Sequence, residues 1–329
     1  METLKSEIEN IENEDLNVFV CSFPNREDVY LPGKYEIIEF LWRTNYGCAV
    51  VAYDIYDRKT VLVRINDNET SNYSNEESYL FNDMYSESVL IQYMLDNPLS
   101  IKFIDEINTK DWHMLITEYT ELGTLDEFVF RHNGMCNHFR LVYSWCRQLV
   151  DGIYDLHVIK KLAHFDISPQ NLCVTKKCDL KLTDFNQSIF SFSDETGLLI
   201  QKLEEDCENE KLIFKCKAVT KDIYPGIPAF VSPELYSNKE FDAFANDIWA
   251  LGCVLFYIIT GKQAFIAPTH SNGIFTYIYT GEWILDRCQK FSWLKSIYKA
   301  YESVFIVIDK MLKPEKDRIN IKKIKQLIN

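Results

Sequence analysis

One short stretch of the sequence constrains this chain more than any other, because it sets a histidine, an aspartate and an asparagine at a fixed spacing. His164, Asp166 and Asn171 follow the spacing H-x-D-x-x-x-x-N. A further carboxylate, Asp184, lies in the segment 183–186 (T-D-F-N). Transfer of a phosphoryl group needs an acid beside the acceptor hydroxyl and oxygen ligands for Mg²⁺. This spacing supplies both from one loop and the strand that follows it.

Two later stretches indicate which family this loop resembles. Residues 226–234 (G-I-P-A-F-V-S-P-E) are similar to the end of a protein kinase activation segment, and residues 247–252 (D-I-W-A-L-G) to the helix that anchors the catalytic loop. The chain therefore resembles the protein kinase family over roughly residues 31 to 329. Phosphotransferases for small molecules share the first motif but lack these two, so that class is the least favoured.

The resemblance implies an α+β, bilobal fold, and hydrophobic periodicity agrees with it. We expect an acidic extension over residues 1–30, disordered or a short docked helix, a small β-rich N-lobe over 31–117 and a large α-helical C-lobe over 118–329. Residues 191–220 read as a loop insertion in the activation segment. Strands are predicted at 35–42, 49–53, 60–65, 101–107 and 113–119. Helices are predicted at 84–95, 125–130, 139–159, 247–260 and 319–328.

Charge and composition exclude several other classes of protein. The net charge of −14 disfavours binding to a nucleic acid backbone, which depends on Lys and Arg. The ten cysteines include no Cys-x-x-Cys pair, and the longest apolar stretch, Leu251 to Ile259, is too short for a membrane span. We expect a cytoplasmic protein, with the nucleus left open, that binds no membrane and takes a protein substrate or a protein binding partner.

The resemblance also implies roles for individual residues. Asp166 corresponds to the catalytic base, Asn171 and Asp184 to ligands of Mg²⁺, and Glu87 to the helix glutamate that pairs with the cation at position 64. Arg318 is expected to form a structural ion pair with Glu234. Residues expected to bind ATP are Gly47, Ala49, Leu62, Thr117, Glu118, Thr120 and Cys173.

The small lobe departs from the family pattern at the phosphate-binding groups. Arg64 stands where the family has a lysine, and a forked guanidinium does not replace a compact ammonium. The loop that should read G-x-G-x-x-G keeps only its last glycine, Gly47, in residues 42–47. Arg43 of this loop is expected to be solvated. Leu62 replaces an alanine while Ala49 replaces a valine, two changes that roughly offset in volume.

The large lobe departs beside the base. Ser168 and Ile227 stand where serine/threonine kinases carry a lysine and a threonine, so a linked polar cluster is lost. Phe165 replaces the arginine that clamps an activation-loop phosphate, which argues against switching by phosphorylation. Asn186 replaces a glycine, and we expect it to tolerate a positive φ there. His157 receives no role.

Two functions remain open. The retained base and metal-ligand residues favour an active serine/threonine protein kinase that uses ATP and Mg²⁺. The altered phosphate-binding groups favour a weak kinase or a pseudokinase that acts in signalling, and we prefer this interpretation. A lysine cluster at 322–325 reads as the solvated face of the last helix.

Overall fold

The computed structural model describes residues 17–23, 27–68, 84–190, 199–206, 211–218, 226–237, 240–265 and 292–328. The chain divides into a small unit, residues 1–95 with 101–119, and a large unit, residues 96–100 with 120–329. The two units are described separately below.

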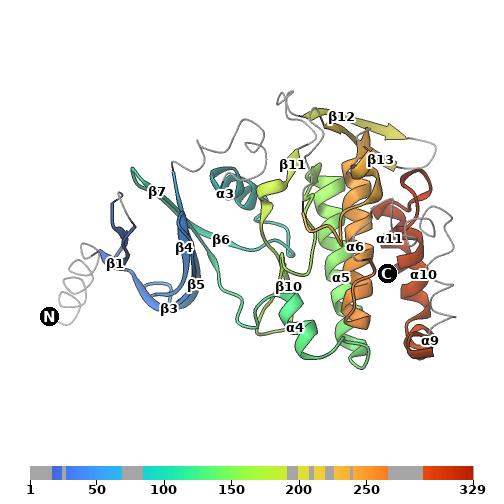
Figure 1. The fold of residues 1–329 in the computed structure, drawn as a ribbon, viewed down its shortest axis with the longest axis horizontal. Helices are drawn as coiled ribbons and strands as arrows, with labels where there is room; N and C mark the ends of the chain where they lie inside the picture. The colour runs from blue at the N-terminus through green and yellow to red at the C-terminus, as the bar shows by residue number, and fades with distance from the viewer. Residues whose placement is uncertain are drawn as a thin grey trace. The chain divides into compact units, whose positions relative to one another are not determined.

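A five-stranded antiparallel sheet forms the small unit, in the order β3-β4-β5-β7-β6 (Figure 1). Its strands are β3 (Tyr35–Arg43), β4 (Gly47–Asp54), β5 (Lys59–Asp67), β6 (Phe103–Asn108) and β7 (Trp112–Glu118). Along β5, Val61, Val63 and Ile65 are fully buried whereas Leu62 and Arg64 are half-buried. This period of two is what alternating side chains produce in a strand, and the five predicted strands are confirmed.

The N-terminal residues add a second, two-stranded sheet to the small unit. Strands β1 (Val18–Cys21) and β2 (Val29–Leu31) pair antiparallel. Val20, Phe23 and Leu31 join the apolar core formed by the five-stranded sheet. The prediction of disorder or a docked helix is therefore wrong for residues 18–21 and 29–30, because apolar side chains of this segment pack against the core of the sheet. Residues 1–16 lie outside the described part of the chain.

One helix, α3 (Met84–Tyr93), accompanies the sheet in the described part of the small unit. It confirms the helix predicted from residue 84 and ends two residues before the expected Leu95. Glu87 and Ile91 are both fully buried. They lie one turn apart and so share the face that the helix turns inward.

The large unit is mainly helical. Its helices are α4 (Leu125–Arg131), α5 (Phe139–Tyr154), η1 (Asp155–Ile159), α6 (Ala243–Thr260), α9 (Ser292–Ala300), α10 (Glu302–Met311) and α11 (Ile321–Ile328). In Figure 1, α5 and α6 run side by side through this unit, in green and orange. The four helices predicted here are confirmed, with shifts of a few residues at their ends.

Helix α6 is the core of the large unit. All of its residues are buried. It is long and apolar enough to meet the length and composition criteria for a membrane span, but its complete burial is what a core helix of a folded unit has. The Asp242 side chain caps its first turn by accepting the Phe244 N–H at 3.0 Å, and Gly261, at φ 66°, ends it. A Cβ at position 261 would lie 2.7 Å from the Gly134 nitrogen, so only glycine fits there.

Short strands and 3₁₀ turns lie in the segments that connect these helices. They are β8 (Leu162–Ala163), β9 (Leu172–Val174), β10 (Leu180–Leu182), η2 (Phe185–Gln187), β11 (Ile189–Phe190), η3 (Pro233–Ser237), β14 (Phe241–Asp242) and η4 (Glu315–Asp317). Strand β8 pairs with β11 and β9 with β10, both antiparallel. These two pairs bracket residues 164–171 and 183–188.

The expected loop insertion over 191–220 contains regular structure. Strands β12 (Leu199–Asp206) and β13 (Lys211–Ala218) form an antiparallel hairpin. Strand β13 also pairs with β14, placing Lys215 opposite Asp242 and Cys216 opposite Phe241. The prediction of a loop is wrong for these strands. Residues 191–198, 207–210 and 219–220 of the insertion lie outside the described residues.

Candidate active site

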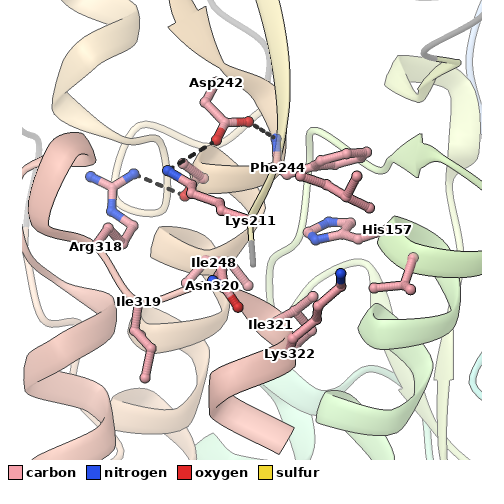
Figure 2. Close-up of a pocket in the computed structure, with 13 residues that line it drawn as sticks. His157, Lys211, Asp242, Phe244, Ile248, Arg318, Ile319, Asn320, Ile321 and Lys322 are labelled. Carbon is pink, nitrogen blue, oxygen red and sulfur yellow. Dashed lines mark hydrogen bonds and ion pairs between the residues drawn. The ribbon is translucent and has the colours of Figure 1, made fainter. Parts of the chain in front are cut away.

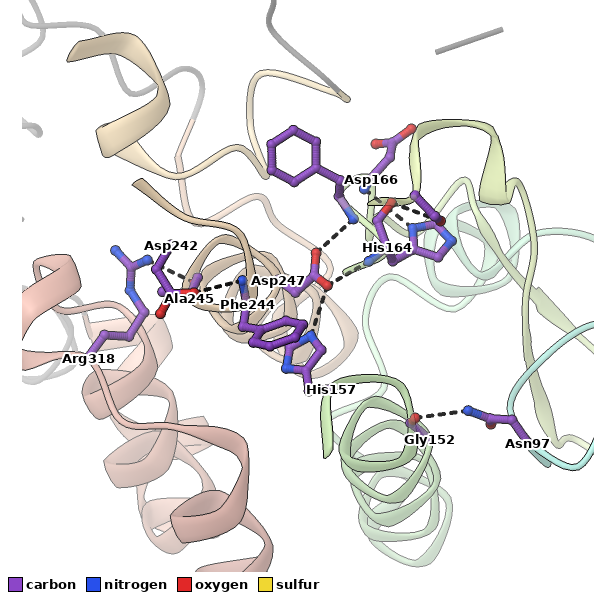
Figure 3. A network of polar contacts seen from close by, with 12 residues as sticks. Asn97, Gly152, His157, His164, Asp166, Asp242, Phe244, Ala245, Asp247 and Arg318 are labelled. Carbon is purple, nitrogen blue, oxygen red and sulfur yellow. Dashed lines mark hydrogen bonds and ion pairs between the residues drawn. The ribbon is translucent and has the colours of Figure 1, made fainter. Parts of the chain in front are cut away.

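The loop that carries Asp166 is anchored on helix α6 by one buried carboxylate. Asp247 Oδ1 accepts the Phe165 N–H at 2.9 Å, and Oδ2 accepts the His164 N–H at 2.8 Å. The Nε2 atom of His157 lies 2.9 Å from the same Oδ2. Figure 3 places Asp247 between His157 and the backbone of this loop. Because these groups are buried, the bonds fix the loop on the core helix.

His157 is a residue that sequence reasoning missed. It is 2% exposed and stacks on Phe244, with ring centroids 4.4 Å apart. A histidine between two apolar residues, Leu156 and Val158, has to find a polar partner when it is buried. That requirement is the signal that could have identified it as a support of the loop.

Asp166 is held by its own loop and by the activation segment. Asn171 Nδ2 donates to Asp166 Oδ2 at 2.8 Å and to its carbonyl oxygen at 2.9 Å. The backbone of Ile227 donates a further hydrogen bond to this carboxylate. Gly226 has φ 82°, and a Cβ there would lie 2.5 Å from Asp166 Oδ1. The turn at 226–227 therefore presses its backbone on the carboxylate, and only glycine permits this approach.

The surroundings of Asp166 make it a better proton acceptor than an ordinary carboxylate. Burial raises the pKa of Asp166 above its usual 3.8, and the charge of Asp184 adds to the rise, while His164 and Asn171 oppose it. A raised pKa brings a base closer to the pH at which it works.

The predicted metal ligands fit a Mg²⁺ ion that is shared with phosphates. The Asp184 Oδ1 atom is buried and has no hydrogen-bond partner among the described residues. The amide nitrogen of Asn171 is used by Asp166, so its oxygen is the atom that could bind a cation. The described ranges contain no group of three His, Cys, Asp or Glu residues that could hold a metal alone. Two protein oxygens completed by substrate phosphates are the usual set for Mg²⁺.

The backbone around Asp184 corrects one expectation. Asp184 itself has φ 60° and ψ 69°, in the left-handed region. Asn186 lies in the turn η2 and has no positive φ. The positive φ that Asn186 was expected to tolerate is not found at this position, and the left-handed residue stands two positions earlier. A non-glycine residue in this region costs of order 1–3 kcal/mol and persists where surrounding structure enforces it.

Two substitutions beside the base have visible structural results. The Ser168 side chain is fully buried, and its hydroxyl has no hydrogen-bond partner within the described part of the chain. The Phe165 ring stacks on Phe241, with centroids 5.6 Å apart and planes at 21°. This aromatic contact links the loop that carries Asp166 to β14, and β14 in turn pairs with strand β13 of the hairpin.

In the small unit, Arg64 and Glu87 form the ion pair expected from the alignment. Arg64 Nη2 lies 2.5 Å from Glu87 Oε1, and the Glu87 side chain is completely buried. Strand β5 supplies the arginine and helix α3 the glutamate. The expected pairing is confirmed: the Arg64 guanidinium pairs with Glu87, as the lysine does in the family pattern.

Several residues predicted to bind ATP share one face of the small-unit sheet. Ala49 lies opposite Arg64, and Leu62 lies opposite Thr117. Directly opposed residues in antiparallel strands point to the same side. Gly47 pairs with Asn66 on this side, and a Cβ on Gly47 would lie 2.1 Å from the Ile65 carbonyl oxygen.

The turn between β3 and β4 uses its own backbone donors. The Thr44 N–H donates to the Gly47 carbonyl at 2.9 Å, and the Tyr46 N–H donates to Thr44 Oγ1 at 3.1 Å. Arg43 is exposed to solvent, as expected, and its guanidinium also lies 4.6 Å from the centre of the Phe23 ring and donates to the Ser22 carbonyl. Two N–H groups and the one arginine of this turn are therefore engaged within the small unit.

The remaining predicted residues fall in both units. Glu118, in the small unit, exchanges hydrogen bonds with the backbone of Lys102. Thr120, in the large unit, is buried. Cys173 lies on β9, and its backbone forms an isolated antiparallel β-bridge with that of Thr124.

The predicted Glu234 and Arg318 ion pair is confirmed. Arg318 Nη2 lies 2.9 Å and 3.1 Å from the two carboxylate oxygens of Glu234. Its Nη1 donates to the Ala245 carbonyl at 2.8 Å, and its guanidinium lies 5.0 Å from the centre of the Trp249 ring. This arginine thus ties the end of the activation segment to α6.

Comparison with known proteins agrees with this geometry. The profile of the protein kinase domain matches residues 35–327. The chain is 26% identical over 198 residues to the probable serine/threonine-protein kinase KCC4 of Saccharomyces cerevisiae, covering 60% of the chain and 16% of the relative. It is 25% identical over 233 residues to CBL-interacting serine/threonine-protein kinase 21 of Arabidopsis thaliana, covering 71% of the chain and 48% of the relative. The chain thus spans less than half the length of each.

Proposed function

Because the chain belongs to the protein kinase domain family, we propose that it is a weak kinase or pseudokinase that acts in signalling mainly through binding to other proteins. One observation carries this proposal. In the turn that should cover the ATP phosphates, the N–H groups of Thr44 and Tyr46 donate hydrogen bonds within the turn itself. Phosphate recognition by such a loop depends on exposed backbone N–H groups.

The cation at the phosphate position supports the same conclusion. Arg64 is held by Glu87 at 2.5 Å, where the family uses a lysine. A guanidinium is larger and planar, so it places its charge differently from an ammonium. A displacement of about 1 Å from the productive geometry can cost roughly 100-fold in rate.

The catalytic loop favours retention of nucleotide and metal binding. Asp166 and Asn171 are bonded to each other, and Asp184 keeps a buried oxygen without a hydrogen-bond partner in the described residues. Mg²⁺, when bound, would neutralise charge on the phosphate groups. Asp166 would accept the proton of an acceptor hydroxyl, and Asn171 would hold its carboxylate in place.

An active serine/threonine kinase is the second candidate. The intact contact between Arg64 and Glu87 and the raised pKa of Asp166, caused mainly by burial, favour it. The two candidates differ in turnover: robust phosphorylation of a generic protein substrate by the parent chain, lost in Asp166→Ala, would establish the active enzyme.

Binding of nucleotide with Mg²⁺ is tested by thermal unfolding. We expect Mg²⁺ with ATP to raise the melting temperature of the parent chain more than ATP alone, and Asp184→Ala to remove that difference. A ligand at 100 times its Kd adds about 2.7 kcal/mol to the free energy of unfolding. Asp96→Ala, at an exposed aspartate of the large unit, is the matched control and should keep the effect of Mg²⁺. An equal effect of Mg²⁺ in Asp184→Ala would refute the metal assignment.

A further inference from the structure

The hairpin of β12 and β13 is joined to the large unit through β14, which consists of Phe241 and Asp242. Strand β13 pairs with both residues, in the register Cys216 with Phe241 and Lys215 with Asp242. Within the described residues, β13 is the only strand that pairs with β14. Neighbouring residues of a strand point to opposite faces, so these two side chains reach different parts of the unit.

The Phe241 side chain reaches the loop that carries Asp166. Its ring stacks on that of Phe165, the residue before the base, with centroids 5.6 Å apart. Phe165 is 2% exposed and Phe241 is 6% exposed, so bulk water is excluded from the contact. The backbone of Phe165 is held as well, since its N–H donates to Asp247 of α6 at 2.9 Å. Strand β14 therefore adds a second support to a loop that α6 anchors.

The Asp242 side chain reaches the start of α6 and the hairpin (Figure 2). One carboxylate oxygen accepts the Phe244 N–H at 3.0 Å, and the other lies 3.4 Å from the Lys211 ammonium of β13. The Asp242 side chain is 1% exposed, and a buried charge is costly unless it is paired. Leu212 lines a small cavity together with Phe244 and Ile248 of α6. Consecutive residues of β13 thus fix the hairpin on β14 and on α6.

We propose that the β12–β13 hairpin is a built-in brace of the catalytic loop, residues 164–171, with Lys211 and Phe241 as its positioning residues. Lys211 holds β14 in place, and Phe241 holds Phe165. Strand pairing, an ion pair and an aromatic contact connect the parts, so the brace needs no phosphate. Position 165 lacks the arginine with which the family pattern clamps a phosphate of the activation segment, and the brace supports the loop by other means.

The brace goes beyond the function proposed above and does not depend on it. A braced loop keeps its position whether or not phosphate is transferred, so the test uses neither nucleotide nor turnover. An active kinase and a pseudokinase should give the same result, and the two proposals can fail separately.

Hydrogen exchange, followed by NMR, tests the brace in the parent chain. The reporters are the N–H groups of His164 and Phe165, which donate to Asp247 and exchange when the loop leaves α6. In protein shown by its intact mass to carry no phosphate, we expect both to exchange at least about 100-fold more slowly than in an unstructured peptide. Exchange as fast as in such a peptide would contradict a brace that needs no phosphate.

Each half of the brace has its own variant. Phe241→Leu removes the aromatic contact but keeps an apolar residue, and should speed exchange of the two reporters about 10-fold. Lys211→Ala removes the cation beside Asp242 and should speed exchange about 5-fold, a scale between exposed and buried ion pairs. Lys211→Arg keeps the cation and should behave like the parent. Lys177→Ala, at an exposed lysine elsewhere in the large unit, is the matched control and should also leave the reporters unchanged.

The double variant distinguishes a brace from two independent contacts. Because Lys211 acts on the loop through Phe241, Lys211→Ala should have almost no further effect on the reporters once residue 241 is leucine. The N–H groups of α5 report on unfolding of the whole unit. Faster exchange in α5 alone, with the reporters unchanged, would mean that these contacts stabilise the fold without supporting the loop. That result, an increase in the double variant equal to the product of the single ones, or an equal increase in Lys177→Ala would overturn the proposal.

Discussion

Replacing Arg318 with alanine is expected to lower the free energy of unfolding by about 3–5 kcal/mol, the usual cost of removing one partner from a buried ion pair. The Arg318 side chain is 1% exposed and that of Glu234 is 19% exposed. The substitution leaves the Glu234 carboxylate with one fewer cation and removes the hydrogen bond to the Ala245 carbonyl. Chemical denaturation, followed by circular dichroism, measures the loss.

Two further variants show whether the buried pair is the cause. Arg318→Lys keeps the charge but lacks the fork that contacts both oxygens of Glu234, so we expect an intermediate loss. Arg140→Ala removes an exposed arginine of α5 and should leave stability unchanged. A loss in Arg318→Ala no larger than in Arg140→Ala would contradict the assignment of this pair as structural.

The pH dependence of the free energy of unfolding tests the ion pair between Glu234 and Arg318 independently. Burial tends to raise the pKa of Glu234, but the charge of Arg318 outweighs it and holds the pKa below the usual 4.5. A carboxylate with a lowered pKa adds stability at pH values above 4.5 and loses it as the pH falls through its folded-state pKa. The difference in stability between the parent and Arg318→Ala should therefore shrink as the pH is lowered below about 4.5.

The sequence predicted the site best where spacing along one element fixes the geometry. The residues from Asp166 to Asn171 share one loop, so their contact follows from the motif. Glu87 and Arg64 belong to separate elements, yet their pairing could be predicted because both positions are set by the family alignment. The regular strands of the small unit followed from a period of two, which local sequence displays directly.

Contacts between segments that lie far apart in the chain could not be predicted from the sequence. Strand β13 pairs with only two residues of β14, and such a short partner leaves no periodic signal. The Arg43 guanidinium lies over the ring of Phe23, a residue from the segment that was predicted to be disordered or a short docked helix. Asn186 lies inside the 3₁₀ turn η2, where φ is negative, and the left-handed residue is Asp184, immediately before that turn.

A double repair of the catalytic residues should give the largest change in turnover. We expect Arg64→Lys/Ser168→Lys to raise the rate of phosphotransfer by about 100-fold over the parent, the scale attached to one well-placed charge in a transition state. Arg64→Lys alone should change little, because the base still lacks its neighbouring lysine. Residues that act as one catalytic unit are strongly non-additive, so the double repair should exceed the product of the single repairs.

The measurement is transfer of labelled phosphate from ATP to a generic protein substrate, with the melting temperature of each variant as a check of folding. This check matters for Ser168→Lys, since Ser168 is fully buried and a lysine needs space that its neighbours must provide. Adding Asp166→Ala to the double repair should abolish the gain, because the proton acceptor is then missing. Gains that merely multiply would show that Arg64 and Ser168 act independently. A rate still close to that of the parent would place the main defect in the turn at 44–46, whose N–H groups neither repair releases.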